Sequence, residues 1–451
     1  MNNIAINGAK FIDVVNDSII KKNIGIKSGK IVEITDDIVD AEIKIDGVGK
    51  IISPGFIDFH SHVDGKEFSA ECVLRQGATT TLGGERSFDG RAIFDIERKG
   101  FLLNHGFNFS HSFTLRPAVG IKERYKPATQ KEIDAMSYLA EQFFENGAYC
   151  IHLGLEFVPG TSFEEILRIA ETAKKYERVL LIHLRKDGQE AIDTFKEIIE
   201  ICRITGAAVH ILHLMYMVGF QGVMDQALEI IDSARSEGID ITADTGIYSA
   251  FPSCIGSSIL DKGWEKGYGN NIGVKNLLIS SGIYAGNYCD EKLFRYLREE
   301  FPNTLVTVFA CDEKQIEKSI VKPYVYISTN AADGPHYTKI GHPETSGTFA
   351  KLIKRYVVEE KIIDLVEAIK KITILPAKRF GIIGKGFIDK GADADLLILD
   401  LKKIKDKSDY IGRGDPNAPP DGIDYIIVNG QIAVENNEIK ARNLGKLLKH
   451  I

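Results

Sequence analysis

The chain has 451 residues, of which 44% are hydrophobic and 26% charged, and its formal net charge is −7. This composition is typical of a globular protein that buries a large core without disulfides or structural metals. It lacks the dense basic patch of a nucleic-acid-binding protein and any apolar run near the roughly 18 residues that a membrane span needs. The length indicates one large barrel with an appendage, or two or three domains.

The cysteines and the N-terminal sequence indicate the cellular compartment of the protein. The six cysteines are scattered and form no C-x-x-C pair, so free thiols in a reducing cytoplasm are favoured over a disulfide framework. The opening MNNIAINGAKFIDVV has neither the charged nor the apolar region of a signal peptide. We therefore expect a cytoplasmic protein with no membrane partner.

The two ends of the chain predict β-strands. Near the N-terminus, β-branched residues cluster between turn signals such as Asn7-Gly8 in NIAINGAKFIDVV and NIGIKSGKIVEITDD. Strand character returns after about residue 381, in GADADLLILD and in IDYIIVNGQIAVENNEI with its Asn-Gly and Asn-Asn turns. The simplest architecture pairs residues 1–54 with 381–451 in one small β-sandwich domain.

Residues 55–380 alternate helical and strand-like patterns. Helical spacing of apolar residues occurs in AIFDIERKGFLLNHG, KEIDAMSYLAEQFFENG, SFEEILRIAETAKKYE, EAIDTFKEIIEICRITG and MDQALEIIDSARSEG. The strand-like runs are FIDFH, TTTLGG, YCIHLGLEF, VLLIHLR, AAVHILHL, IDITADTG, NTLVTVFA and VYISTN. This alternation predicts a parallel sheet of βαβ units, and eight runs predict a (β/α)₈ barrel. A doubly wound open sheet is the main alternative, but we find no early Gly-rich phosphate loop.

Histidines fall at the ends of predicted barrel strands. His60 and His62 end the first strand, and at positions i and i+2 their side chains point to the same side. His183 lies near the end of VLLIHLR, His213 near the end of VHILHL, and Asp333 is the last residue of VYISTNAAD. Each alone is more often a structural residue, and Asp333 alone is a turn residue before Gly-Pro. Together, imidazoles and a carboxylate at one barrel mouth indicate a metal hydrolase, in which the metal activates water and polarises a carbonyl.

Several motifs resemble a known family. PGFIDFHSH is similar to the opening motif of the amidohydrolase superfamily, and the whole chain resembles its D-aminoacylase (N-acyl-D-amino-acid deacylase) branch. The other segments that carry the resemblance are GATTTLGGE, GAYCIHLGLEFVPG, LIHLRKDGQEAIDTFKEI, GAAVHILHL, GHPETSGTFAKLIKRYV, AIKKITILPAKRFGI and GADADLLILD. The resemblance covers nearly the entire chain and implies a metal-dependent amidohydrolase.

The resemblance also implies residue roles. His60 and His62 would hold the alpha metal, and His183 and His213 would hold the beta metal. Asp333 would ligate the alpha metal, act as general base, and then return the proton to the leaving nitrogen. One or two zinc ions are implied as cofactors.

The bridging ligand departs from the family pattern. The deacylases carry a cysteine in the turn after GxTT, whereas this chain reads LGGERS there. Glu85 is the obvious replacement, and a carboxylate is a harder ligand that would accept Mn or Fe as well as Zn. Alternatively, Glu85 pairs with Arg86 or another cation at the barrel rim.

The predicted fourth strand departs as well. YCIHLGLEF lacks the carbamylated lysine that other amidohydrolases have there or nearby. His152 stands where the deacylases tend to have Ser or Thr, so it either lines the site and donates to the substrate carbonyl or is structural. Glu156 fits the family pattern and is expected to orient its neighbours.

The third departure concerns the substrate. Glu344 stands in HPETSGTF where the deacylases usually have an arginine suited to a carboxylate, and Met215 stands where they commonly have a lysine. Arg185 is one candidate for a substitute cation. Glu344 would meet an amino group of the substrate, unless a loop shift moves it into solvent. In DTGIYSAFPS, Tyr248 and Ser253 are weaker candidates for substrate contact, by resemblance to a segment that lines the family's pocket.

We therefore expect a metal-dependent hydrolase that cleaves a C–N amide bond with metal-activated water. N-acyl-D-amino-acid deacylation is the leading activity. One alternative is a cyclic amide hydrolase of the hydantoinase or dihydroorotase kind, and another is a non-catalytic scaffold that has lost the metals. The expected partner is a small-molecule amide, nucleic acid is not expected to bind, and a homo-oligomer is compatible with the sequence.

Overall fold

The computed structural model describes residues 1–451 except 64, 85–88, 221, 269–270 and 332–340. Two predicted metal ligands, Glu85 and Asp333, lie outside the described residues. All six cysteines are described, and none forms a disulfide. Within the described part of the chain, no helix has the length and apolar character needed to cross a membrane.

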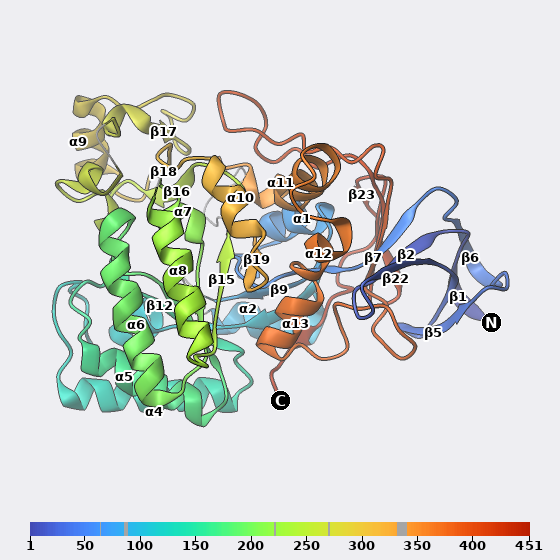
Figure 1. Cartoon of the computed structure of the whole chain (residues 1–451), viewed down its shortest axis with the longest axis horizontal. Helices are drawn as coiled ribbons and strands as arrows, with labels where there is room; N and C mark the ends of the chain where they lie inside the picture. The colour runs from blue at the N-terminus through green and yellow to red at the C-terminus, as the bar shows by residue number, and fades with distance from the viewer. Residues whose placement is uncertain (64, 85–88, 221, 269–270, 332–340) are drawn as a thin grey trace.

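Both ends of the chain build two β-sheets at one side of the molecule, at the right of Figure 1. The first sheet has the order β5-β4-β1-β6 and contains β1 (Asn2–Asn7), β4 (Asn23–Lys27), β5 (Lys30–Thr35) and β6 (Ala41–Asp46). The second has the order β23-β22-β21-β20-β7-β2-β3 and contains β2 (Lys10–Asp13), β3 (Ser18–Lys21), β7 (Ile51–Pro54), β20 (Leu396–Leu399), β21 (Ile423–Val428), β22 (Gln431–Glu435) and β23 (Glu438–Ile439).

The second sheet joins the two ends of the chain directly. In its antiparallel β20–β7 pair, Leu397 lies opposite Ser53. The turn between β21 and β22 is made by Asn429 and Gly430, which both have positive φ, 48° and 77°, as a tight hairpin requires. The predicted pairing of the termini in a β-sandwich is therefore confirmed.

Eight parallel strands form the barrel, and each pairs with the next along the chain. They are β8 (Phe56–Asp58), β9 (Ala78–Gly83), β10 (Asn104–Phe107) continued by β11 (Phe109–Ser110), β12 (Cys150–Gly154), β13 (Val179–His183), β14 (Val209–Ile211), β15 (Ile241–Thr245) and β19 (Val325–Ile327). Beyond β19, the Asn330 amide donates to the His60 carbonyl over 3.0 Å, and the His62 amide donates to Ala331 over 3.0 Å. These bonds connect the last strand to the first, so the (β/α)₈ prediction is confirmed.

Helices cover the outside of the barrel (Figure 1). α4 begins with a reciprocal capping box between Thr129 and Glu132, and Ser162 caps α5, so both helices begin at side chains that satisfy free amides. The helices are α1 (Glu67–Arg75), α2 (Gly90–Lys99), α3 (Arg116–Ala118), α4 (Gln130–Glu145), α5 (Phe163–Lys175), α6 (Ala191–Thr205), α7 (Leu214–Val218), α8 (Val223–Ser236), α9 (Glu291–Glu300), α10 (Lys314–Ile320), α11 (Glu344–Lys351), α12 (Leu365–Lys370) and α13 (Ile374–Phe380).

One predicted barrel strand is wrong. NTLVTVFA contains β18 (Leu305–Val308), which is the middle strand of a separate antiparallel sheet with β16 (Phe251–Cys254) and β17 (Leu277–Ile279). Figure 1 shows this sheet and α9 at the upper left. The segment between β15 and β19 is therefore an insertion on the barrel rather than one of its βα units.

The third barrel strand, which no predicted strand covers, begins in the last residues of a segment predicted as helix. Helix α2 stops at Gly100, whose φ of 77° is unfavourable for other residues. β10 and β11 follow, with the sequence NHGFNFS. The polar residues of this segment do not follow an apolar strand pattern, yet they are buried, and the Asn104 side-chain amide donates to the Thr79 carbonyl and to Asp395.

Candidate metal centre and substrate pocket

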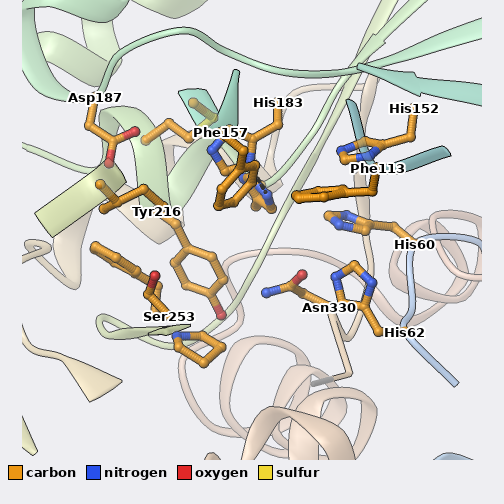
Figure 2. A pocket seen from close by; sticks show the side chains of 15 residues that line it. His60, His62, Phe113, His152, Phe157, His183, Asp187, Tyr216, Ser253 and Asn330 are labelled. Atoms are coloured by element: carbon orange, nitrogen blue, oxygen red, sulfur yellow. Dashed lines mark hydrogen bonds between the residues drawn. The ribbon is translucent and has the colours of Figure 1, made fainter. Parts of the chain in front are cut away.

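Four histidines from different strand ends gather at the carboxyl-terminal mouth of the barrel. His60 and His62 follow β8, His183 is the last residue of β13, and His213 lies two residues after β14. The ring centroids are 6.0 Å apart for His60 and His62, 5.1 Å for His60 and His213, and 4.6 Å for His183 and His213. The strands therefore bring together these four predicted ligands, three of which Figure 2 labels.

The spacing of the histidine nitrogens suits a divalent metal. His183 Nδ1 and His213 Nε2 lie 3.1 Å apart, close to the separation of about 3.3 Å between neighbouring ligand atoms of a tetrahedral zinc site. Among the described residues, no group of three or more metal-ligating side chains has the spacing of a complete site. The other two predicted ligands, Glu85 and Asp333, lie outside those residues.

His213 adopts an unusual backbone conformation for this position. Its φ of 36° and ψ of 57° are left-handed, which is costly for a residue with a side chain. The His213 amide donates to Asp244 Oδ1 over 2.6 Å, and this bond holds the turn in place. The local strain thus aims the imidazole at His183.

Asp244, the fourth residue of β15, contacts two histidine side chains inside the barrel. Its Oδ2 lies 2.8 Å from His60 Nδ1 and 3.3 Å from His210 Nε2, and the residue is fully buried. Burial alone would raise the pKa of Asp244, but the adjacent His60 and His210 hold it well below its usual range. The carboxylate therefore engages His60 Nδ1 and leaves Nε2 for the barrel mouth. The sequence interpretation missed this role; the signal was an acid inside the apolar run IDITADTG.

Replacing Asp244 with asparagine should weaken metal binding by about 10- to 100-fold, because a carboxylate that orients a ligating imidazole makes that difference in metal sites. Competition with a chelating indicator would measure the dissociation constant. Asp193→Asn, on the exposed face of α6, is the matched control and should bind metal as the unmodified chain does. Equal affinities in both variants would contradict the role of Asp244.

The histidines open into a pocket with aromatic walls (Figure 2). His152 and Ser253, both predicted as substrate contacts, line it. His152 lies on β12 with its Nδ1 3.5 Å from Ser110 Oγ, and Ser253 Oγ lies 2.9 Å from Ser257 Oγ. Phe113 and Phe157 also line the pocket.

Two other predicted contacts lie elsewhere. Arg185 pairs with Glu197 over 2.9 Å and donates to the carbonyls of Pro159 and Thr161, so its guanidinium is engaged outside the pocket lining. The physical reason is that β13 ends at His183, so Arg185 lies beyond the strand, and its guanidinium is held by Glu197 and two backbone carbonyls. We therefore withdraw Arg185 as the partner of a substrate carboxylate.

Tyr248 is the second predicted substrate contact that lies outside the pocket lining. Its hydroxyl donates to Asp406 over 3.2 Å, and the Lys351 ammonium lies 4.0 Å from the ring centroid. Tyr248 thus packs between α11 and the C-terminal segment instead of lining the pocket. It is the packed aromatic residue that a large ring in this position often is.

Glu344 is buried, with 1% of its surface exposed, so the proposed shift into solvent is wrong. Its Oε2 accepts a 2.6 Å hydrogen bond from the Tyr216 hydroxyl, and its Oε1 lies 3.5 Å from Asn330 Nδ2. Tyr216 and Asn330 line the pocket, whereas Glu344 stands one layer behind them. It therefore positions pocket residues. Met215 is fully buried in the apolar core.

Two further carboxyl groups lie beside the pocket. Glu156 Oε2 is 3.1 Å from His183 Nε2, which agrees with its expected orienting role, and burial raises the pKa of Glu156 to about 8. Asp187 lines the pocket and accepts a hydrogen bond from the Tyr268 hydroxyl. Burial, together with the nearby Glu156, raises the pKa of Asp187 well above its usual range. The sequence interpretation missed Asp187, which resembles an ordinary turn residue before Gly188.

Comparison with known proteins gives matches along the whole chain. The model of the amidohydrolase family matches residues 325–433. The N-acyl-D-glutamate deacylase of Alcaligenes xylosoxydans xylosoxydans is 24% identical over 95% of this chain and 92% of its own length. The D-aminoacylase of the same organism is 25% identical over 98% of this chain and 96% of its own.

Solved structures agree with the fold. The N-acyl-D-glutamate deacylase from Bordetella bronchiseptica, complexed with zinc and a phosphonate inhibitor, superposes with a TM-score of 0.87 at 22% identity, covering 99% of both chains. A D-aminoacylase gives 0.88 at 23% identity over 100% of both chains. A D-hydantoinase is more distant, with 0.65 at 16% identity over 99% of both.

The fold, the histidine centre and these matches define the class of protein: it is a metal-dependent hydrolase of carbon–nitrogen bonds. The chain resembles the amidohydrolase superfamily, whose family model matches residues 325–433, and the relatives that it matches over nearly its whole length are a D-aminoacylase and a related deacylase. The resemblance carried by PGFIDFHSH is thereby confirmed.

Proposed function

We propose that the protein is a zinc-dependent deacylase that hydrolyses an N-acyl-D-amino acid or a related small amide. The observation that carries the proposal is the gathering of His60, His62, His183 and His213 at one barrel mouth. The deacylases that match the chain from end to end support it.

The ligands are assigned as the sequence predicts. His60 and His62 hold one ion, and His183 and His213 hold a second ion or complete the first site. Asp333 and Glu85 are the remaining ligands. When bound, the metal polarises the amide carbonyl and activates a water molecule. Mn or Fe could replace Zn at a site that contains a carboxylate.

Side chains of the protein transfer the proton, contact the substrate and exclude water. Asp333 takes a proton from the water molecule and returns it to the leaving nitrogen. His152 contacts the amide carbonyl. Phe113 and Phe157 exclude bulk water from the pocket, which strengthens the polar interactions inside it. Glu344 holds Tyr216 in place through the 2.6 Å hydrogen bond.

Turnover of acyl-D-amino acids tests the proposal. We expect the zinc-loaded protein to release free amino acid from N-acetyl-D-amino acids, at least about tenfold faster than from their L-enantiomers. A chelator should abolish the activity and added zinc should restore it, because the water and the carbonyl are activated by the metal. Amine release can be followed with a primary-amine reagent.

Two outcomes would contradict the proposal in different ways. Ring opening of hydantoin or dihydropyrimidine without turnover of acidic, neutral or basic acyl-D-amino acids would favour a cyclic amide hydrolase. Less than about 0.2 equivalents of transition metal, unrestored by added zinc, would favour a non-catalytic scaffold, since a hydrolytic site of this kind needs bound metal.

A further inference from the structure

The pocket provides little to hold a negatively charged substrate group. Among the described residues that line it, none is Lys or Arg. Arg185 is engaged with Glu197, and Glu344 and Met215 stand where cations were expected from the resemblance. Asp187 contributes a carboxyl group instead. The described lining thus offers no Lys or Arg to a free carboxylate and one acidic side chain, Asp187, to a cation, and a bound cation would favour the charged form of that acid.

Asp187 has an acceptor atom that the described residues leave without a partner. Its Oδ2 accepts the Tyr268 hydrogen bond, but its buried Oδ1 has no hydrogen-bond partner among them. The residue is only 9% exposed. A buried carboxylate oxygen without a partner is costly, so the site gains when a ligand supplies a donor.

Asp187 lies on the opposite side of the pocket from His60 and His62, as Figure 2 shows. Apolar side chains line the same pocket, among them Phe157, Met217 and Ile259. A ligand with a reacting amide at the histidines and a charged group at Asp187 would therefore need an apolar connection between them.

We propose that Asp187 is a specificity-determining residue that receives a cationic nitrogen of the substrate, an ammonium or a guanidinium, through its Oδ1. This inference rests on the proposed deacylase function and names its substrate class: acylated compounds with a basic group at the far end of an apolar chain, such as N-acyl-D-amino acids with basic side chains. Acidic acyl-D-amino acids are poor substrates.

Two neighbours of Asp187 refine the proposal. Tyr268 ties Asp187 to the insertion between β15 and β19, and its ring lies 5.8 Å from that of Phe251, which lines the pocket. Lys186 is exposed and lines an adjoining hollow with Asp187 and Glu156. Water hydrates the exposed Lys186 ammonium and weakens its attraction to Asp187. A substrate cation buried in the pocket would lack that hydration and would therefore interact more strongly with Asp187.

The test compares a cationic substrate with its neutral isostere. N-acetyl-D-lysine and N-acetyl-D-2-aminoheptanoate differ only in the terminal ammonium and methyl groups. We expect the unmodified protein to favour the lysine derivative by about 10- to 100-fold in kcat/KM, the range of a buried charge-assisted hydrogen bond. In Asp187→Asn this ratio should fall to near one, because asparagine keeps the shape and loses the charge.

Asp193→Asn is the matched control, since it removes an exposed aspartate a few residues away, and it should keep the ratio. A ratio near one in the unmodified protein would overturn the proposal even if Asp187→Asn did not fold. A ratio that survives Asp187→Asn would show that the charge of Asp187 does not select the cation, and would also overturn the proposal.

The failure of the deacylase function has a different signature. If neither compound is hydrolysed, titration calorimetry with the same pair decides the cation site separately. Tighter binding of N-acetyl-D-lysine, lost in Asp187→Asn, would support the site and reject the reaction. Equal binding of the two compounds would reject the site as well.

Discussion

Replacing His60 with alanine should lower kcat/KM by at least about 1,000-fold and reduce the bound metal. The imidazole is held by Asp244 at 2.8 Å and faces the other histidines at the barrel mouth. Loss of a ligand removes several kcal/mol of transition-state stabilisation when the metal is displaced. Steady-state kinetics together with elemental analysis of the same preparation would measure both effects.

His450→Ala is a suitable control for this experiment. His450 lies at the C-terminus, where its ring packs against Tyr149 at a centroid distance of 5.3 Å. We expect this variant to keep its metal and its activity. A His60→Ala protein with full metal content and full activity would overturn the assignment of the metal centre.

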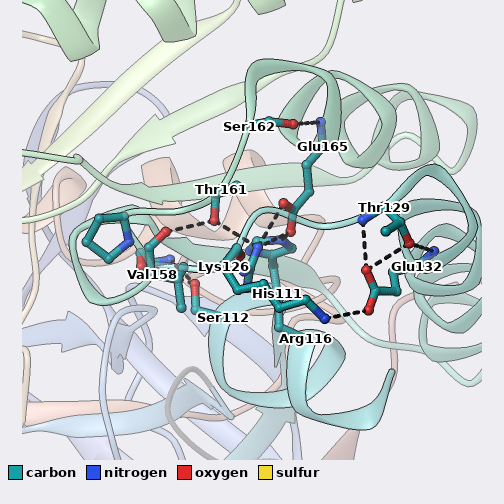
Figure 3. Close-up of polar contacts among 12 residues, drawn as sticks. His111, Ser112, Arg116, Lys126, Thr129, Glu132, Val158, Thr161, Ser162 and Glu165 are labelled. Carbon is teal, nitrogen blue, oxygen red and sulfur yellow. Dashed lines mark hydrogen bonds and ion pairs between the residues drawn. The ribbon is translucent and has the colours of Figure 1, made fainter. Parts of the chain in front are cut away.

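Arg116→Met should destabilise the barrel by about 3–5 kcal/mol, the usual cost of breaking a buried ion pair. Figure 3 shows the arrangement. Arg116 Nη1 donates to both carboxylate oxygens of Glu165 over 2.6 and 2.8 Å, and Arg116 Nη2 donates to the Lys126 carbonyl. His111 Nε2 lies 2.7 Å from Glu165 Oε1. Methionine would leave a fully buried carboxylate with His111 as its remaining side-chain partner among the described residues. Urea unfolding followed by circular dichroism would measure the loss.

Burial raises the pKa of Glu165, but His111 and Arg116 lower it by more, so the carboxylate is charged in the folded protein. The double variant Arg116→Met/Glu165→Gln should recover part of the lost stability, since it leaves no unpaired charge. Arg168 is on α5, as Glu165 is, and forms an exposed ion pair with Glu171. The control variant Arg168→Met should therefore lower the free energy of unfolding by less than about 1 kcal/mol. A loss below that in Arg116→Met would contradict the interpretation.

This buried cluster also bears on the pocket. His111 and Arg116 lie on either side of Phe113, whose ring lines the substrate pocket. The ion pair therefore fixes the helical segment that follows the third barrel strand and, with it, one aromatic wall of the site.

Much of the fold could be predicted because the spacing of hydrophobic residues indicates where most helices and strands lie. Five helices and seven of the eight barrel strands coincide with apolar periodicity, as α5 and β13 do. The exception, β10–β11, is built from buried polar residues such as Asn104, which the pattern reports as a loop. β18 has the apolar composition of a barrel strand, and only its antiparallel partners reveal the insertion.

The histidines of the candidate site could be predicted from the sequence, whereas the acidic residues that contact or surround them were harder to predict. His60, His62, His183 and His213 stand at strand ends, which is a local signal. Asp244, Glu344 and Asp187 act through neighbours 14 to 184 positions away in the chain, such as Asn330 for Glu344 and His60 for Asp244. Only tertiary contacts make those pairs visible.

Anomalous diffraction at the zinc edge, from crystals of the zinc-loaded protein, tests the metal centre most directly. We expect a peak at the barrel mouth within about 2.0–2.1 Å of imidazole nitrogens of His60 and His62, of His183 and His213, or of both pairs. A zinc peak elsewhere, with none at these four histidines in a catalytically active crystal, would contradict this expectation.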